Sequence, residues 1–287
     1  MITGNYTALI TPFDKNGDID YVALKELLRR QINLGTEGIV LLGSTAEAPM
    51  LKDYEKTQIM KCAESEIGGR VPIIAGINAF SLEEALIQVQ NRGAEGADYL
   101  LVSPPPYIKP TYDGLESYFS KIAKSSKIPV ILYNIPSRTG VNIPFELVKD
   151  LSKNSNIIGI KEASGDMNYI QKLSSLANDD FSIICGNDNL LLPMLSVGAT
   201  AIISVVGNLT PELCSNIIYN YLNGNKESAQ NLYLKYLELF NLLGIESNPI
   251  PIKFALHKLG LIENKYREPL CEPTKEHKDL IENFVKK

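Results

Sequence analysis

The most constraining feature of the sequence is a regular alternation of short apolar runs and amphipathic segments over roughly its first 222 residues. The runs are mostly continuous in their apolar character, which is typical of strands buried on both faces of a parallel sheet. They recur about every 28 residues, which is the length of one strand and one returning helix. Eight strands are predicted, over Asn5–Thr11, Gly38–Gly43, Pro72–Ile77, Tyr99–Ser103, Pro129–Asn134, Ile157–Glu162, Ser182–Gly186 and Ala201–Ser204.

The segments between these runs place apolar residues at helical spacing, as Leu24, Leu28 and Ile32 do in the first of them. Asp20 and Ser81 precede two of the segments and are suitable N-cap residues. Helices are predicted over Tyr21–Leu34, Leu82–Arg92, Gly114–Lys124, Pro144–Ser152, Met167–Ala177 and Pro211–Leu222.

Eight strand–helix units predict an α/β fold of the TIM (β/α)8 barrel type, over residues 1–224. The alternative is a doubly wound open sheet, which usually carries a glycine-rich loop after its first strand. The chain has Thr11-Pro12-Phe13-Asp14 there, so the barrel is preferred. After Gly224 the pattern predicts helices only, near 226–243, 251–259 and 275–285, and we expect residues 225–287 to form a C-terminal helical domain.

Composition excludes several classes of function. The only histidines, His257 and His277, follow the barrel, so neither a Ser-His-Asp triad nor a His-rich zinc site is expected within it. A calcium loop at 14–25 is disfavoured because Ile19 stands where glycine is needed and Lys25 replaces the final glutamate. We expect no metal and no cofactor. The net charge of −5 and the lack of basic clusters predict no binding of nucleic acid, and the lack of a long apolar run predicts no membrane span. The four cysteines form no CxxC motif and no close pair, which predicts reduced thiols in a cytoplasmic protein.

Catalytic groups of a TIM barrel project from the carboxyl ends of its strands, and Lys161 is the only lysine at such an end. Alternation along the strand places Lys161 on the same side as Gly159, facing inward. A desolvated amine has a lowered pKa and attacks carbonyl groups, so Lys161 is a candidate Schiff-base nucleophile. The alternative is a lysine that only extends to the mouth of the barrel.

Two other strand ends supply hydroxyl and guanidinium groups to the same rim, Ser44 and Thr45 after one and Tyr133 and Arg138 at the other. Tyr133 is either an aromatic at the edge of the core or a phenol that transfers protons near the amine. Ser44 and Thr45 are either turn and cap residues or donors that hold a carboxylate. Arg138 is either a solvated loop charge or a fork for a substrate carboxylate.

These candidates lie in motifs whose order and spacing match one family. The chain resembles the dihydrodipicolinate synthase family of pyruvate-dependent, class I aldolase-type lyases, which also includes N-acetylneuraminate lyase. The resemblance covers nearly the whole chain. The matching segments are 43–47 (GSTAE), 133–140 (YNIPSRTG), 160–165 (IKEASG), 186–188 (GND), 203–205 (ISV) and 248–253 (NPIPIK).

The resemblance implies a 4-hydroxy-tetrahydrodipicolinate synthase activity on the diaminopimelate route to lysine. In this reaction, the amine of Lys161 condenses with pyruvate, and the resulting enamine attacks L-aspartate 4-semialdehyde. It also implies a homotetramer built as a dimer of dimers. The implied site residues are Lys161 as nucleophile, Tyr133, Ser44 and Tyr107 as a hydroxyl relay in which Tyr107 comes from a neighbouring subunit, Thr45 and Ile203 for pyruvate, Arg138 for the semialdehyde carboxylate, and Gly186 lining the pocket.

Some positions depart from the family pattern. Ser44 keeps the hydroxyl but lacks the methyl group of the threonine that is usual in the synthases. The alternative function is therefore a pyruvate aldolase that acts on a sialic acid or a 2-keto-3-deoxy sugar acid, and Arg138 favours the synthase because the sugar-acid enzymes lack a cation there. A non-catalytic binder of 2-oxo acids would be expected to lose Lys161 or Tyr133, and both are present.

The pocket that binds lysine as an inhibitor in some members of the family is poorly matched. The aligned residues are Ala48, Asp53, Lys56, Phe80, Glu84 and Pro106. Only Glu84 agrees with the residue found in the inhibited enzymes. We expect weak or absent inhibition by lysine.

Overall fold

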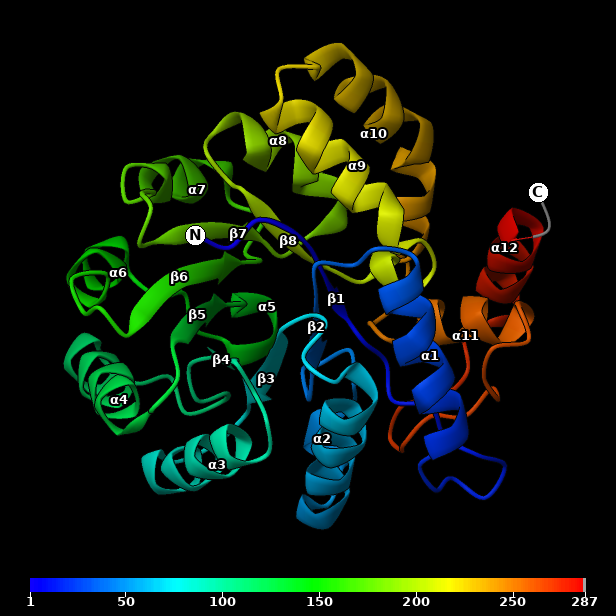
Figure 1. The fold of residues 1–287 in the computed structure, drawn as a ribbon, viewed down its shortest axis with the longest axis horizontal. Helices are drawn as coiled ribbons and strands as arrows, with labels where there is room; N and C mark the ends of the chain where they lie inside the picture. The colour runs from blue at the N-terminus through cyan, green and yellow to red at the C-terminus, as the bar shows by residue number, and fades with distance from the viewer. Residues whose placement is uncertain (286–287) are drawn as a thin grey trace.

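Eight parallel strands close into a barrel in the computed structural model, which describes residues 1–285 (Figure 1). Each strand pairs with its neighbours in chain order, and β1 also pairs with β8, which closes the ring. The predicted barrel is confirmed, and each predicted strand overlaps an observed one. The strands are β1 Gly4–Ala8, β2 Gly38–Leu41, β3 Ile73–Ile77, β4 Tyr99–Val102, β5 Val130–Asn134, β6 Ile157–Glu162, β7 Ser182–Cys185 and β8 Ala201–Ser204.

Helices surround the barrel, and two of them begin directly after the predicted capping residues Asp20 and Ser81. The Asp20 carboxylate accepts hydrogen bonds from the amides of Val22 and Ala23, at 3.0 and 2.9 Å, and Ser81 caps its helix in the same way. The helices of this part are α1 Tyr21–Asn33, α2 Asp53–Ile67, α3 Leu82–Ala94, α4 Tyr112–Ser125, α5 Pro136–Thr139, α6 Phe145–Leu151, α7 Met167–Ser174, α8 Leu191–Ser196 and α9 Pro211–Leu222.

Three of these helices, α2, α5 and α8, were not predicted. Helix α5 has only four residues, which is too few for a periodic pattern. In α2 the buried face includes only four apolar residues among fifteen positions, so its apolar stripe is weak in the sequence. Helix α8 has six residues and follows a short 3-10 turn, which is too short for a periodic pattern to develop. The spacing of the eight units nevertheless predicted a segment that connects β2 to β3, where α2 lies, and one that connects β7 to β8, where α8 lies.

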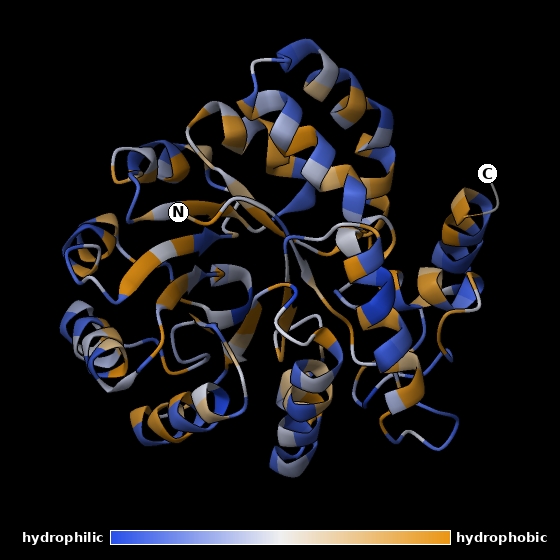
Figure 2. Cartoon of the chain, in the orientation of Figure 1, coloured by the Kyte–Doolittle hydropathy of each residue, from blue (hydrophilic) through white to orange (hydrophobic). Residues whose placement is uncertain are grey.

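Apolar side chains form two separate layers, one inside the barrel and one between the sheet and the helices. Figure 2 shows hydrophobic residues along the strands and on the inner sides of the helices. The inner layer includes Val40, Ile74, Ile131, Ile184 and Ile203, each almost fully buried. Because both faces of every strand are covered, the strands read as continuous apolar runs in the sequence.

Three further helices follow the barrel: α10 Lys226–Leu242, α11 Ile250–Lys258 and α12 Lys275–Val285. Helix α10 packs on α8 and α9, and α11 packs on α12 and on the 3-10 turn after β8 (Figure 1). All three helices were predicted, and each predicted end lies within one residue of the observed end. The division into a barrel at 1–224 and a separate domain at 225–287 stays a prediction. No helix among residues 1–285 is long and apolar enough to cross a membrane.

A fully buried ion pair joins the C-terminal helices to the barrel. Lys253 Nζ of α11 lies 2.5 Å from Glu47 Oε1, and the backbone amide of Arg267 donates to Glu47 Oε2 at 2.8 Å. Lys253 Nζ also lies 4.2 Å from the centroid of the Phe13 ring. Burial lowers the pKa of Lys253 to about 8, and the Glu47 carboxylate opposes this lowering. The pair therefore anchors the loop after β2 to α11.

Lys253→Met should lower the free energy of unfolding by about 3–5 kcal/mol, because it leaves the Glu47 carboxylate buried without its cation. The matched control is Lys258→Met on the same helix. Its partner is Glu282, at 3.0 Å and with both side chains about one-third exposed, so its loss should cost under about 1 kcal/mol. Urea denaturation at one fixed protein concentration measures both. If both variants lost the same free energy of unfolding, the buried Lys253–Glu47 pair would contribute no more to stability than the surface pair, which would contradict the prediction.

Candidate active site

A single lysine, Lys161, enters the inner layer of the barrel near the carboxyl end of β6. The strand register pairs it with Tyr133 on β5 and with Ile184 on β7. Its Nζ lies 4.3 Å from the centroid of the Tyr133 ring, and only 6% of the residue is exposed. The inward direction predicted for Lys161 is therefore confirmed. At Gly159, a Cβ would lie 2.5 Å from the backbone oxygen of Ser182, so the strands can approach here only because Gly159 has no side chain.

A cavity of about 300 Å³ opens beside Tyr133 at this end of the barrel. It brings together three of the predicted site residues from separate elements: Ser44 from the loop after β2, Tyr133 from β5 and Arg138 from α5. The Tyr133 ring that forms part of its wall is the ring over which the Lys161 amine lies. The lining residues are Ser44, Pro49, Lys56, Asn78, Phe80, Glu84, Ser103, Pro106, Tyr133, Ile135, Arg138 and Thr139.

Asn248 connects two other predicted site residues, Thr45 and Arg138. The Asn248 side-chain Nδ2 donates to Thr45 Oγ1 at 2.8 Å, and Arg138 Nη2 donates to the Asn248 backbone oxygen at 2.7 Å. Thr45 is buried, with 4% of its surface exposed. The sequence marked 248–253 only as a turn and a family motif. No periodicity could have placed Asn248 beside residue 45, because the contact joins parts of the chain 203 residues apart.

The ends of β5 and β6 are held by a buried carboxylate that points away from Lys161. Glu162 accepts a hydrogen bond from Asn134 Nδ2 at 2.7 Å and another from the amide of Ser164. Burial raises the pKa of Glu162, and these hydrogen bonds oppose the increase. Asn134 Oδ1 in turn accepts from the amide of Ile143 at 2.9 Å. These bonds hold the strand ends that carry Tyr133 and Lys161.

Asp188 performs a similar task at the end of β8. Its carboxylate accepts from the amides of Val205 and Val206 at 3.0 and 3.1 Å, and from the hydroxyl of Ser204. Burial raises the pKa of Asp188, and these bonds and the charge of Lys161 oppose the increase. The backbone that directly follows Ile203 is therefore held by hydrogen bonds.

The remaining predicted residues differ in their placement. Ile203 packs in the same inner cluster as Tyr133. Gly186 donates its amide to the backbone oxygen of Glu162 at 2.8 Å, and a Cβ there would lie 2.7 Å from the Ala163 Cβ. Tyr107 is 87% exposed and does not line the cavity of its own chain. The structure therefore does not bring Tyr107 to Ser44 and Tyr133 within one chain.

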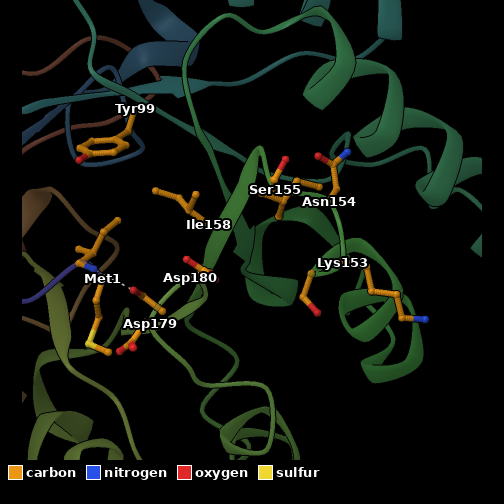
Figure 3. A pocket seen from close by; sticks show the side chains of 12 residues that line it. Met1, Tyr99, Lys153, Asn154, Ser155, Ile158, Asp179 and Asp180 are labelled. Carbon is orange, nitrogen blue, oxygen red and sulfur yellow. Dashed lines mark hydrogen bonds between the residues drawn. The ribbon is translucent and has the colours of Figure 1, made fainter.

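A second cavity, of about 430 Å³, lies at the opposite end of the barrel (Figure 3). Met1, Asp179 and Asp180 lie on one side of it, and Asn154 and Ser155 on the other. It is at the amino ends of β6 and β7, whereas the chemistry of TIM barrels occurs at the carboxyl ends. Among residues 1–285, no group of three or more His, Cys, Asp or Glu side chains is arranged to hold a metal ion.

Comparison with known proteins identifies relatives over the full length of the chain. Residues 1–287 match the model of the dihydrodipicolinate synthetase family. The chain is 39% identical over 289 residues to the 4-hydroxy-tetrahydrodipicolinate synthase of Hydrogenobaculum sp., which covers 100% of this chain and 99% of that protein.

Solved structures give the same relationship. The 4-hydroxy-tetrahydrodipicolinate synthase of Methylacidiphilum fumariolicum SolV has a TM-score of 0.97 and 39% identity, over 100% of this chain and 95% of that one. The chloride-inhibited dihydrodipicolinate synthase of Acinetobacter baumannii, complexed with pyruvate, has a TM-score of 0.96 and 36% identity, over 100% and 98% of the two chains. Because the family model and these relatives span the whole chain, the protein belongs to the dihydrodipicolinate synthetase family.

Proposed function

We propose that the protein is a 4-hydroxy-tetrahydrodipicolinate synthase that condenses pyruvate with L-aspartate 4-semialdehyde through a Schiff base on Lys161. The observation that carries the proposal is a buried amine set 4.3 Å from the centre of the Tyr133 ring, at the carboxyl end of the barrel. The relative from Acinetobacter baumannii, whose structure contains pyruvate, supports the choice of the first substrate.

The reaction follows from an amine, a phenol and two carbonyl compounds. The Lys161 nitrogen attacks the ketone carbon of pyruvate, and loss of water gives the imine. Loss of a methyl proton then gives an enamine, whose carbon forms the new bond to the aldehyde carbon of the semialdehyde. The amino group of the product attacks the imine carbon, which closes the ring and releases Lys161. Tyr133 and Ser44 are proposed to transfer the protons.

Each of the two substrates has a carboxylate, and we propose separate hydrogen-bond donors for each. We assign the pyruvate carboxylate to Thr45 and to the backbone at Ile203, and the semialdehyde carboxylate to Arg138, with Gly186 lining the pocket. Only one hydrogen bond of the Arg138 guanidinium is directed at Asn248. The other N–H groups of a guanidinium are then available for a forked contact with a carboxylate.

We propose that Tyr107 completes the relay in a neighbouring subunit, within a homotetramer built as a dimer of dimers. The support is its placement: Tyr107 and its neighbour Ile108 are 87% and 55% exposed, and Phe80 nearby along the cavity rim is 60% exposed. Exposed large apolar groups of this kind mark interaction surfaces. The cysteines of the described chain are all free, which suits the reducing cytoplasm, where we place the protein.

Incubation with pyruvate and borohydride should add a reduced pyruvate group to Lys161. The reason is that borohydride reduces the imine to a stable secondary amine, which peptide mass spectrometry locates. Lys161→Arg should abolish the adduct, because a guanidinium does not form the imine. Lys258→Met serves as the control, since that partly exposed amine is paired with Glu282 and its loss should leave the fold and the adduct on Lys161 unchanged. An adduct on another lysine would overturn the mechanism.

Arg138→Ala should lower kcat/KM for the semialdehyde by about 10- to 150-fold, the equivalent of a charged hydrogen bond worth about 1.5–3 kcal/mol. Trapping of pyruvate on Lys161 should be nearly unchanged, because the cation serves the second substrate. The comparison uses initial rates with the semialdehyde and with sugar aldehydes. Faster turnover of a sugar aldehyde by the unaltered protein would favour the sialic acid or 2-keto-3-deoxy sugar acid alternative.

Lysine at sub-millimolar concentration should leave the initial rate nearly unchanged. Glu84, the one matching pocket residue, already accepts hydrogen bonds from the Phe80 amide and from Gln88 Nε2, each at 3.0 Å. Lys56 in the cavity lining is a donor-only side chain paired with Asp53 at 3.2 Å, so it offers no acceptor to an ammonium group. The measurement is the initial rate against lysine concentration at fixed substrates. A substantial loss of rate would contradict this prediction.

A further inference from the structure

We propose that Asn248 is a positioning residue that sets the direction of the Thr45 hydroxyl, so that Thr45 donates its proton to the carboxylate of the bound 2-oxo acid. The inference deepens the proposed function and rests on it, because it concerns how the same site holds pyruvate. Asn248 is not proposed to contact the Lys161 nitrogen or the ketone carbon of pyruvate.

The first step is the polarity of the contact between the two side chains. Asn248 Nδ2 is the donor and Thr45 Oγ1 the acceptor, at 2.8 Å. A hydroxyl oxygen that accepts a hydrogen bond still has its own proton to donate. Neither this proton nor the Thr45 backbone amide is donated to any group within residues 1–285. Thr45 therefore presents two free donors, which together match the needs of a carboxylate.

The second step is how firmly Asn248 is held. Its backbone oxygen accepts from Arg138 Nη2 at 2.7 Å. Asn248 lies just before α11, which carries Lys253, and Lys253 binds Glu47 two residues after Thr45. The loop after β2 is thus held at two points, to α11 by the buried ion pair and to the turn before α11 by the Asn248–Thr45 hydrogen bond.

The third step is an unsatisfied atom. The side-chain oxygen of Asn248 is buried and has no hydrogen-bond partner in the described part of the chain. An orphaned buried acceptor of this kind is costly, by about 1–3 kcal/mol. An apolar side chain would avoid that cost but could not donate to Thr45. Such a locally unfavourable choice is expected where the group serves the site rather than stability.

The test compares Asn248→Ala with Asn248→Asp. Alanine removes the donor, and the pyruvate KM should increase about tenfold. Aspartate has nearly the shape of asparagine, but a carboxylate only accepts hydrogen bonds, so it should attract the Thr45 proton to itself and add a negative charge near the substrate carboxylate. The pyruvate KM should then increase about a hundredfold. Both variants keep the backbone oxygen that binds Arg138. In Asn248→Ala, which adds no charge near that guanidinium, the semialdehyde KM should therefore change less than threefold.

A Thr45→Val background provides the internal control. If Asn248 acts through the Thr45 hydroxyl, Asn248→Ala should raise the pyruvate KM no further in that background. Half-saturation of borohydride trapping on Lys161 gives the same comparison without the second substrate, and the thermal midpoint shows whether each variant is folded.

The outcomes separate the inference from the proposed function. Absence of trapping in the unaltered protein would overturn the proposed function. If the unaltered protein is trapped normally but the pyruvate KM of Asn248→Asp is no higher than that of Asn248→Ala, the inference about Asn248 is overturned and the proposed function is not. A full effect of Asn248→Ala in the Thr45→Val background would also overturn it.

Discussion

The pairing of β1 with β8 is the constraint on which the rest of the structure depends. Once the sheet closes, the carboxyl ends of all eight strands meet at one rim, and residues as distant in sequence as Thr45 and Asn248 become neighbours. Closure also places one face of every strand inside the barrel, while the helices cover the other face, and the apolar side chains on both faces are buried. A dry interior strengthens every electrostatic interaction within it, so each polar group placed there needs a partner or a purpose.

Two buried lysines differ in whether a carboxylate is paired with their amine. Lys253 has Glu47 at 2.5 Å and lies against aromatic rings, and its pairing joins α11 to the loop after β2. Lys161 makes no ion pair within residues 1–285, and the described contact of its amine is with the face of the Tyr133 ring. Burying an amine without a carboxylate is unfavourable for folding alone, and such groups concentrate at functional sites. The contrast distinguishes the structural lysine from the lysine that we propose to be reactive, without reference to any relative.

Much of this arrangement was predictable from the sequence, for reasons that can be stated. Strand β6 matched its predicted bounds because a continuous apolar run ends in a charge at the rim, and that charge is Lys161. Helix α2 was missed because its apolar stripe is weak. Asn248 was read as part of a turn because a local pattern carries no information on contacts across 203 residues. Tyr107 lies outside the cavity of its own chain, so its proposed role depends on a second copy.

The placement of Asn248 also bears on how the two substrates are told apart. Its side chain contacts Thr45, whereas its backbone oxygen contacts Arg138, on the four-residue helix α5. One residue therefore contacts both proposed carboxylate-binding groups, but through chemically different atoms. A change of side chain at 248 alters only the first contact, since every residue keeps a backbone oxygen. Under the proposed roles, a change at 248 would alter the binding of the 2-oxo acid through Thr45 and leave the contact of Arg138 with the backbone in place.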